Sequence, residues 1–156
     1  MRCLRLAALA ALATVTACSA PAGGTLVLVG ATLIDGTGKP PLKDALVVLE
    51  GGRIKAVGHQ ARVPLPKGAR VFDARGKFIL PQPGRLHPGA AAAAFAERVR
   101  AGIQPLQALA ELAAGGTIEP GRPADLLILD QDPLLSPENL GSAFRVMTAG
   151  RLDPPP

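Results

Sequence analysis

Short apolar segments separated by glycine-containing turns constrain the fold of this chain more than any other feature of its sequence. Five segments rich in Val, Leu and Ile follow one another at regular spacing, at residues 25–35, 45–50, 53–58, 69–73 and 77–80. Gly51-Gly52 predicts a hairpin between the second and third, because glycine readily adopts the positive φ of a tight turn. Ala74-Arg75-Gly76 predicts a second hairpin between the last two. The pattern is typical of an antiparallel sandwich or a barrel-like sheet.

The strand pattern is interrupted once and then returns. Pro81-Gln82-Pro83-Gly84 ends the early strands, since proline cannot donate a ladder hydrogen bond. Helices are predicted at residues 90–101 and from Pro105, which suits a first-turn position, to Ala113. One face of the second helix carries Leu106, Leu109, Ala110 and Ala113. Strands are predicted again at residues 124–130, 145–148 and 151–152, the last two joined by a hairpin turn at Ala149-Gly150.

Composition excludes several classes of protein. The chain has 2 His and 2 Cys, too few for a catalytic centre built from several histidines or for a disulfide-stapled scaffold. It has no Trp or Tyr and 4 Phe, so a nucleic-acid surface based on aromatic stacking is not expected. At 48% hydrophobic residues, the sequence is typical of a folded protein rather than a disordered polyelectrolyte.

Residues 1–17 predict an export signal, with Arg2 and Arg5 before a short apolar stretch. Val15-Thr16-Ala17-Cys18 resembles the lipobox of bacterial lipoproteins. That resemblance implies cleavage before Cys18, acylation of its thiol, and a tether at residues 18–24. The expected location is the bacterial cell envelope, lipid-anchored at the periplasmic face or the outer membrane. The alternative is an ordinary signal peptidase site at Thr16 or Ala20.

Cleavage would also change the charge of the protein. Loss of Arg2 and Arg5 lowers the 17 basic residues to 15, against 12 acidic residues. No run of Lys or Arg remains, so a dedicated surface for polyanions is not expected. Cys3 would leave with the signal and Cys18 would carry lipid, so the exported chain would contain no disulfide.

Several linked segments resemble metal-dependent amidohydrolases, nearest to their imidazolonepropionase-like and prolidase-like branch. Residues 26–38 and 45–58 resemble the opening strands of that family, and residues 71–81 the stretch that leads into its catalytic barrel. Residues 116–126, 130–134 and 146–151 resemble the closing segment of the same family. In that family the two terminal segments form a β-sandwich beside a (β/α)₈ barrel of about 250 residues. Here only residues 82–101 separate Pro81 from Gly102.

The resemblance therefore implies a composite amidohydrolase-type β-sandwich, mainly β, in which one or two helices replace the barrel. Its parts would be the N-terminal sandwich segment at 25–81, an irregular or helical insert at 82–116, the C-terminal sandwich segment at 117–152 and a tail at 153–156.

Family members bind zinc or another divalent metal through a His-x-His pair, further histidines and an Asp, and the metal activates a water. The resemblance implies that His87 is a remnant of that pair, but Arg85 stands at its partner position. His59 and Asp125 fall within the sandwich segments, His59 most simply as a surface residue. We therefore expect no catalytic residue, no metal ligand and no cofactor in this chain.

Three hypotheses follow. The first is a truncated amidohydrolase relative, by family a hydrolase of carbon–nitrogen bonds, inactive without its barrel. The second is a lipid-anchored binding module that docks an unidentified protein or a second copy through the exposed barrel-facing surface. The third is an enzyme completed across subunits or by a separate barrel chain.

Overall fold

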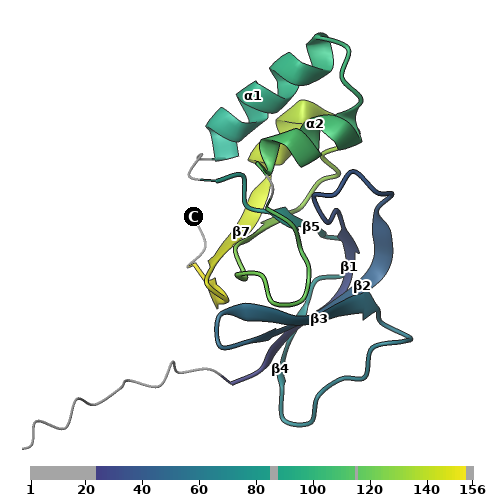
Figure 1. The fold of residues 1–156 in the computed structure, drawn as a ribbon, viewed down its shortest axis with the longest axis vertical. Helices are drawn as coiled ribbons and strands as arrows, with labels where there is room; N and C mark the ends of the chain where they lie inside the picture. The colour runs from purple at the N-terminus through teal and green to yellow at the C-terminus, as the bar shows by residue number, and fades with distance from the viewer. Residues whose placement is uncertain (1–23, 85–87, 115, 154–156) are drawn as a thin grey trace, which may run out of the picture.

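The computed structural model describes residues 24–84, 88–114 and 116–153, which form one sheet with helices stacked at one end (Figure 1). The strands are β1 (Leu26–Leu33), β2 (Leu42–Glu50), β3 (Arg53–His59), β4 (Arg70–Asp73), β5 (Phe78–Pro81), β6 (Leu126–Leu129), β7 (Ala143–Thr148) and β8 (Arg151–Leu152). The helices are α1 (Pro88–Arg100), α2 (Pro105–Leu112) and the 3₁₀ helix η1 (Pro137–Gly141). The predicted fold class, mainly β with a short helical insert, is confirmed.

β1 is the centre of the sheet and binds three strands. Along one edge it pairs with β2 in antiparallel register, and β2 pairs with β3. Along the other edge its first half pairs with β4 and its second half with β5, both in parallel register. The sheet then continues through β6, β7 and β8, all antiparallel. One sheet therefore joins strands from both ends of the sequence.

The predicted hairpin between β4 and β5 is wrong. The turn at residues 74–77 shifts the chain along β1 instead of reversing it. Before the turn, the Ala74 N–H donates to Val29 O at 2.9 Å, and after it the Thr32 N–H donates to Lys77 O at 2.9 Å. The backbone groups of β4 and β5 are thus satisfied by β1, which is eight residues long and accommodates the two four-residue strands in succession.

The inner core of the sheet follows the alternation of side chains along each strand. Leu28, Val47 and Ile128 point into it, and each is fully buried. In β1 the alternation is reset at Gly30, where φ is 80° and the register with β2 shifts. This bulge keeps Leu28, Ala31 and Leu33 on the same inner face.

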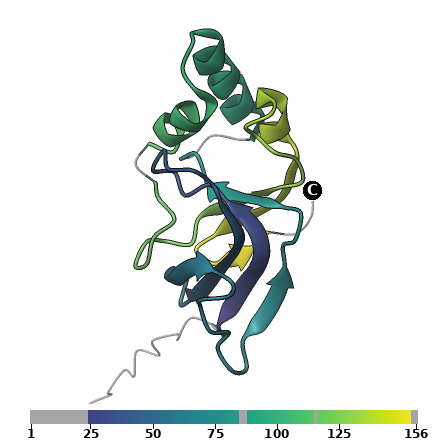
Figure 2. The same cartoon turned by 90° about the vertical axis from the view of Figure 1, so that its right-hand side faces the viewer.

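Both outer faces of the sheet are covered as well. The helices lie together at one end of the sheet (Figure 2). With β5, β6 and β7 they bury a second cluster in which Phe95, Leu109 and Leu112 accompany Leu127 and Leu129. Over β1 and β2, Val63 and Ala69 of the loop at residues 60–69 pack on Val27, Leu46 and Val48. The outer face of β5, β6 and β7 therefore carries helices.

The two helices lie where the sequence predicts them, and Pro105 begins α2. The buried face of α2 agrees with the prediction in part: Leu109 and Ala113 are buried as predicted, together with Ala108 and Leu112. Leu106 and Ala110 are only partly buried. The difference arises because α2 packs against α1 as well as the sheet. Among the described residues, neither helix is long and apolar enough to cross a membrane.

Candidate functional site

The described residues do not fit a divalent metal centre. No group of three or more His, Cys, Asp or Glu side chains lies close enough together in this part of the chain to hold an ion. His59, at the end of β3, accepts a hydrogen bond at Nδ1 from the Ala61 N–H at 3.2 Å, so it caps the turn that follows. His87 and Arg85 lie outside the described residues, as do Cys18 and the predicted signal at 1–17.

Asp125 supports a turn of the sheet. Its Oδ1 accepts a hydrogen bond from the Ala149 N–H at 2.7 Å. Ala149 and Gly150 form the two-residue turn between β7 and β8, with φ values of 48° and 76°. A positive φ is unfavourable for alanine, so the carboxylate stabilises a strained backbone. This contact accounts for an aspartate at this position without any catalytic role.

The two hairpin turns of the sheet meet beside Asp125, in what we call the turn junction: Gly51-Gly52, Ala124-Asp125 and Ala149-Gly150. The Ala124 N–H donates to Gly52 O at 2.9 Å, and the Gly150 N–H donates to Ala124 O at 3.0 Å. A Cβ on Gly52 would lie 2.8 Å from Ala149 O, so a side chain there cannot be accommodated without movement. These hydrogen bonds link the β2–β3 turn to the β7–β8 turn, which lies about a hundred residues later in the sequence.

A surface hollow of about 560 Å³ opens beside the turn junction. It is lined by Gly24, Leu26, Leu49, Glu50, Gly51, Gly52, Arg70, Ala149, Gly150, Arg151 and Leu152. Arg70 and Arg151 are exposed, and Glu50 forms an ion pair with Lys55. Sequence reasoning missed this hollow because its charged residues come from three separate strands, and no local motif joins them.

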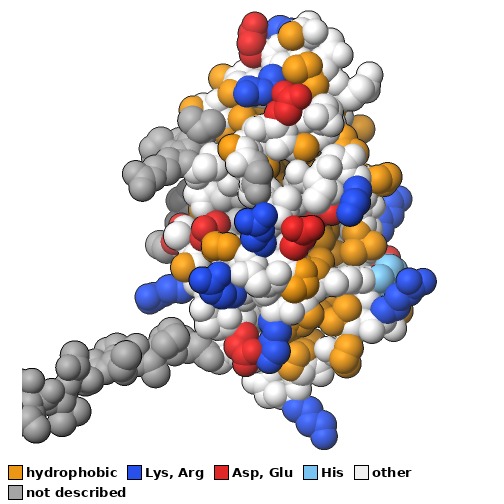
Figure 3. Space-filling view, viewed as in Figure 1, with side chains coloured by type: hydrophobic (Ala, Val, Ile, Leu, Met, Phe, Trp, Pro, Cys, Tyr) orange, Lys and Arg blue, Asp and Glu red, His pale blue; other side chains and the backbone are white. Residues whose placement is uncertain are grey.

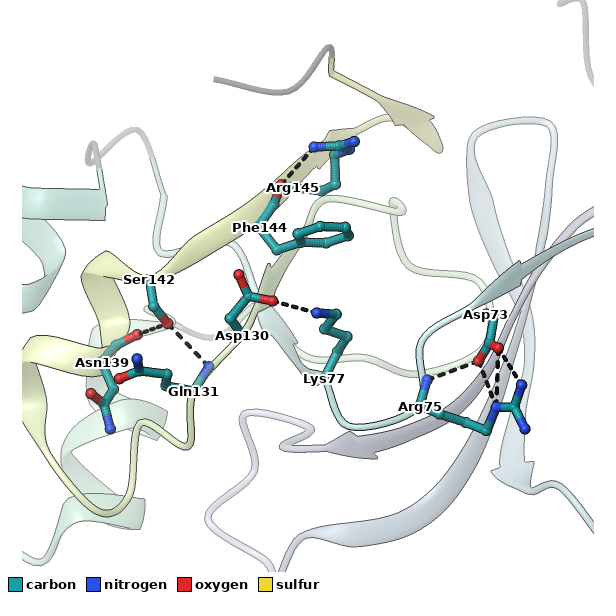
Figure 4. A network of polar contacts seen from close by, with 9 residues as sticks. All are labelled: Asp73, Arg75, Lys77, Asp130, Gln131, Asn139, Ser142, Phe144 and Arg145. Carbon is teal, nitrogen blue, oxygen red and sulfur yellow. Dashed lines mark hydrogen bonds and ion pairs between the residues drawn. The ribbon is translucent and has the colours of Figure 1, made fainter.

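A second polar group lies on the surface near β5, β6 and β7 (Figure 4). Lys77 pairs with Asp130, and its Nζ lies 4.4 Å from the centroid of the Phe144 ring. The guanidinium of Arg145 also stacks on that ring, 4.6 Å from its centroid. These contacts shield the ring and tie the loop before β5 to β6 and β7.

Asp73 and Arg75, also drawn in Figure 4, form a separate ion pair at the turn after β4. Side-chain hydrogen bonds from Arg75 lower the pKa of Asp73 to about 2. The backbone N–H of Arg75 donates to the same carboxylate at 3.1 Å. The pair thus shapes the turn that shifts the chain from β4 to β5, and its charges are matched locally.

Comparison with known proteins places these features in context. No family model matches the chain. The N-acyl-D-aspartate deacylase of Alcaligenes xylosoxydans xylosoxydans is 47% identical over 62 residues, which are 40% of this chain and 12% of that enzyme. D-Aminoacylase, an amidohydrolase with a binuclear metal centre, is 40% identical over 36% of this chain and 11% of its own, with a TM-score of 0.29.

The fold also resembles a solved structure over most of its length. A Bifidobacterium longum protein, described as a candidate prolidase, aligns with 83% of this chain and 94% of its own at a TM-score of 0.65. Its sequence is 10% identical, so this match concerns the fold alone. The similarity in sequence is to amidohydrolase-family enzymes, and it covers a minor part of the deacylase and of D-aminoacylase. The chain spans only 12% of the curated relative that it matches.

Proposed function

We propose that this protein is a non-hydrolytic relative of the amidohydrolases, a lipid-anchored sandwich domain of the bacterial cell envelope. The curated relative is named as an N-acyl-D-aspartate deacylase, and D-aminoacylase is described with a binuclear metal centre. In the proposed role, this chain keeps the sandwich that frames such a site and supplies no hydrolysis by itself.

The observation that carries the proposal is the helical insert between β5 and β6. Phe95 of α1 is fully buried, and Leu109 and Leu112 of α2 are nearly so. They pack on Leu127 and Leu129, which project from the outer face of β6. Burial of one such large apolar side chain contributes about 1.5–3 kcal/mol. A helical insert that shares a core with the sheet supports a protein that folds without the barrel, with helices where the resemblance places the barrel.

Two further observations support the absence of hydrolysis. Among the described residues, no three His, Cys, Asp or Glu side chains lie close enough together to hold a metal ion. The carboxylate of Asp125 accepts a hydrogen bond from the Ala149 N–H. The polar groups at the hollow are the cations Arg70 and Arg151 and the paired Glu50. A cation does not accept a proton from water at neutral pH, so these arginines do not suit a general base.

An activity assay tests this proposal. The purified exported protein is incubated with Zn²⁺ or Mn²⁺ and with N-acyl-D-amino acids, dipeptides or cyclic amides, alongside a His87→Ala variant. We expect no turnover above the blank for either protein. Metal-dependent turnover that the His87→Ala change abolishes would show that the chain is an enzyme.

The lipid anchor is supported by the lipobox-like Val15-Thr16-Ala17-Cys18 and by the short segment of small residues after it, at positions 19–24. Mass spectrometry of the N-terminal peptide from the membrane fraction tests it. We expect a diacylated Cys18 at the N-terminus of the exported chain, and a Cys18→Ala variant that keeps its signal uncleaved. An unmodified N-terminus at Ala17 or Pro21 would instead support the ordinary signal peptidase site.

A further inference from the structure

We propose that the end of the sheet where β1 begins docks on an anionic phospholipid surface. We call this end the docking end and define it by Leu65, Lys67, Arg70, Val71 and Arg151. The orientation of the protein on the membrane rests on the proposed lipid anchor, but the chemistry of the surface does not.

The first argument is charge. Lys67, Arg70 and Arg151 are all exposed, and among the described residues no carboxylate lies within 4.0 Å of their charged groups. Glu50, which also lines the hollow, is neutralised by Lys55. The exposed carboxylate of Asp153 offsets one of the three cations, so the docking end has a net positive charge. Figure 3 shows basic side chains projecting around this half of the molecule.

The second argument is the pairing of cations with exposed apolar side chains. Leu65 is 53% exposed and Val71 52%, and they are two of the three large hydrophobic residues exposed in the described part of the chain. Lys67 and Arg70 stand between them in the sequence. Apolar groups beside basic ones are typical of proteins that lie at a lipid interface, where the apolar groups enter the headgroup region and the cations meet phosphates.

The third argument is the position of the chain's attachment. β1 begins at Leu26, at the end of the sheet opposite α1 and α2 (Figure 1). Seven peptide units separate Cys18 from Thr25, and a fully extended chain spans at most about 3.6 Å per residue. An anchor at Cys18 therefore holds the beginning of β1 within roughly 25 Å of the bilayer. Gly24 lines the hollow, so Arg70 and Arg151 lie at that same end.

The strength of the interaction follows from these charges. A basic residue close to an anionic membrane strengthens binding about fivefold, so the net two positive charges of the docking end correspond to roughly 30-fold. The attraction is short-ranged, since the Debye length is about 8 Å at physiological ionic strength and about 3 Å at 1 M salt. Docking should therefore depend on anionic lipid and disappear at high salt.

Hydrogen exchange on vesicles tests the proposal. The exported protein is mixed with preformed vesicles of phosphatidylcholine alone or with phosphatidylglycerol added, and exchange is read by mass spectrometry. We expect exchange at residues 49–52, 65–71 and 149–152 to slow severalfold on the phosphatidylglycerol vesicles, and to recover at 1 M salt. Protection that is equal on both vesicles, or absent from these segments, would overturn the proposal.

A pair of triple variants provides the control. Lys67→Gln, Arg70→Gln and Arg151→Gln together remove three charges from the docking end. Lys39→Gln, Lys43→Gln and Arg62→Gln remove three exposed charges near the opposite end, where Gln60 N–H donates to Asp44 O. We expect the first variant to lose the lipid-dependent protection and the second to keep it. Equal loss of protection in both variants would show that binding depends on the net charge of the protein and not on the docking end, and would overturn the proposal.

The remaining outcomes are also decisive. Protection that rises with protein concentration in the absence of vesicles would assign this end to contact with a second copy and overturn the proposal. The mass of the Cys18 peptide reports lipidation in the same experiment. Because preformed vesicles can bind the protein with or without acyl chains, failure of the anchor and failure of docking are separately visible.

Discussion

At the scale of single residues, the turn junction depends on glycine at position 52 and aspartate at position 125. Gly51 and Gly52 both have positive φ, 58° and 78°. They differ in their surroundings: a Cβ on Gly51 would meet nothing within 4 Å, whereas a Cβ on Gly52 would meet the backbone of Ala149. An alanine at position 51 would therefore add backbone strain alone, whereas an alanine at position 52 would add both backbone strain and a steric clash.

Substitution of these glycines should give different losses of stability. Gly51→Ala is expected to lower the free energy of unfolding by about 1 kcal/mol, from positive φ alone. Gly52→Ala should lower it by about 1–3 kcal/mol more, because the two pinned turns must separate. Urea denaturation followed by circular dichroism measures both, and equal losses would contradict the close contact.

Asp125 should contribute through its hydrogen bond to the turn. Asp125→Ala removes the acceptor for the Ala149 N–H, and we expect a loss of about 1–2 kcal/mol in the free energy of unfolding. Asp125→Asn keeps a side-chain oxygen at the same place and should lose less than half of that. If both variants lose the same amount, the charge of Asp125 matters more than the hydrogen bond.

At the scale of elements, the helices cover the outer face of β5, β6 and β7. α1 contacts α2 and η1, and all three bury residues against β5, β6 and β7. Arg98 of α1 also pairs with Glu111 of α2 at 3.6 Å, but both side chains are partly exposed. Surface pairs of this kind contribute little, so apolar packing holds the insert in place.

Phe95 should therefore couple the insert to the sheet. Phe95→Ala leaves a cavity under α1, and we expect a loss of about 3–5 kcal/mol in the free energy of unfolding. Val99→Ala, at a partly buried position of the same helix, should lose about 1 kcal/mol or less. Circular dichroism suits the measurement because the chain has no Trp or Tyr.

The shape of the transition distinguishes two arrangements. One cooperative transition for Phe95→Ala, at lower urea concentration, is the expected result. Early loss of the helical signal with an intact sheet would mean that the insert is not part of the main cooperative unit.

At the scale of the whole molecule, strands from both ends of the sequence close one core. β5 and β6 lie side by side although 44 residues separate their facing ends, Pro81 and Leu126. The insert covers the outer face of β5, β6 and β7 with apolar packing. In the described part, the exposed large hydrophobic residues are Leu65, Val71 and Leu135.

We expect a monomer in solution for this reason. Size-exclusion chromatography with light scattering, corrected for detergent where the lipid anchor requires it, should give the mass of one chain. A stable dimer would favour the alternative of self-association and would require another surface or the displacement of α1 and α2.

Much of the secondary structure could be predicted from the sequence, because its determinants are local. The alternation of Val and Leu, the glycines of the β2–β3 turn and Pro105 at the start of α2 act within a few residues. The pairing of β4 and β5 could not be predicted in this way. The turn at Ala74-Arg75-Gly76 has the composition of a hairpin, and only the length of β1 shows that both strands bind along it.

By itself, the sequence determined the strand and helix segments, the small number of histidines and the resemblance to amidohydrolases. The tertiary structure decided where the insert packs, why Asp125 is needed at the turn junction and which charges share a surface. Lys67, Arg70 and Arg151 form no run in the sequence, so the sequence analysis expected no surface for polyanions. Strand pairing brings β4 and β8 to one end of the sheet, because backbone hydrogen bonds join segments without regard to their distance along the chain.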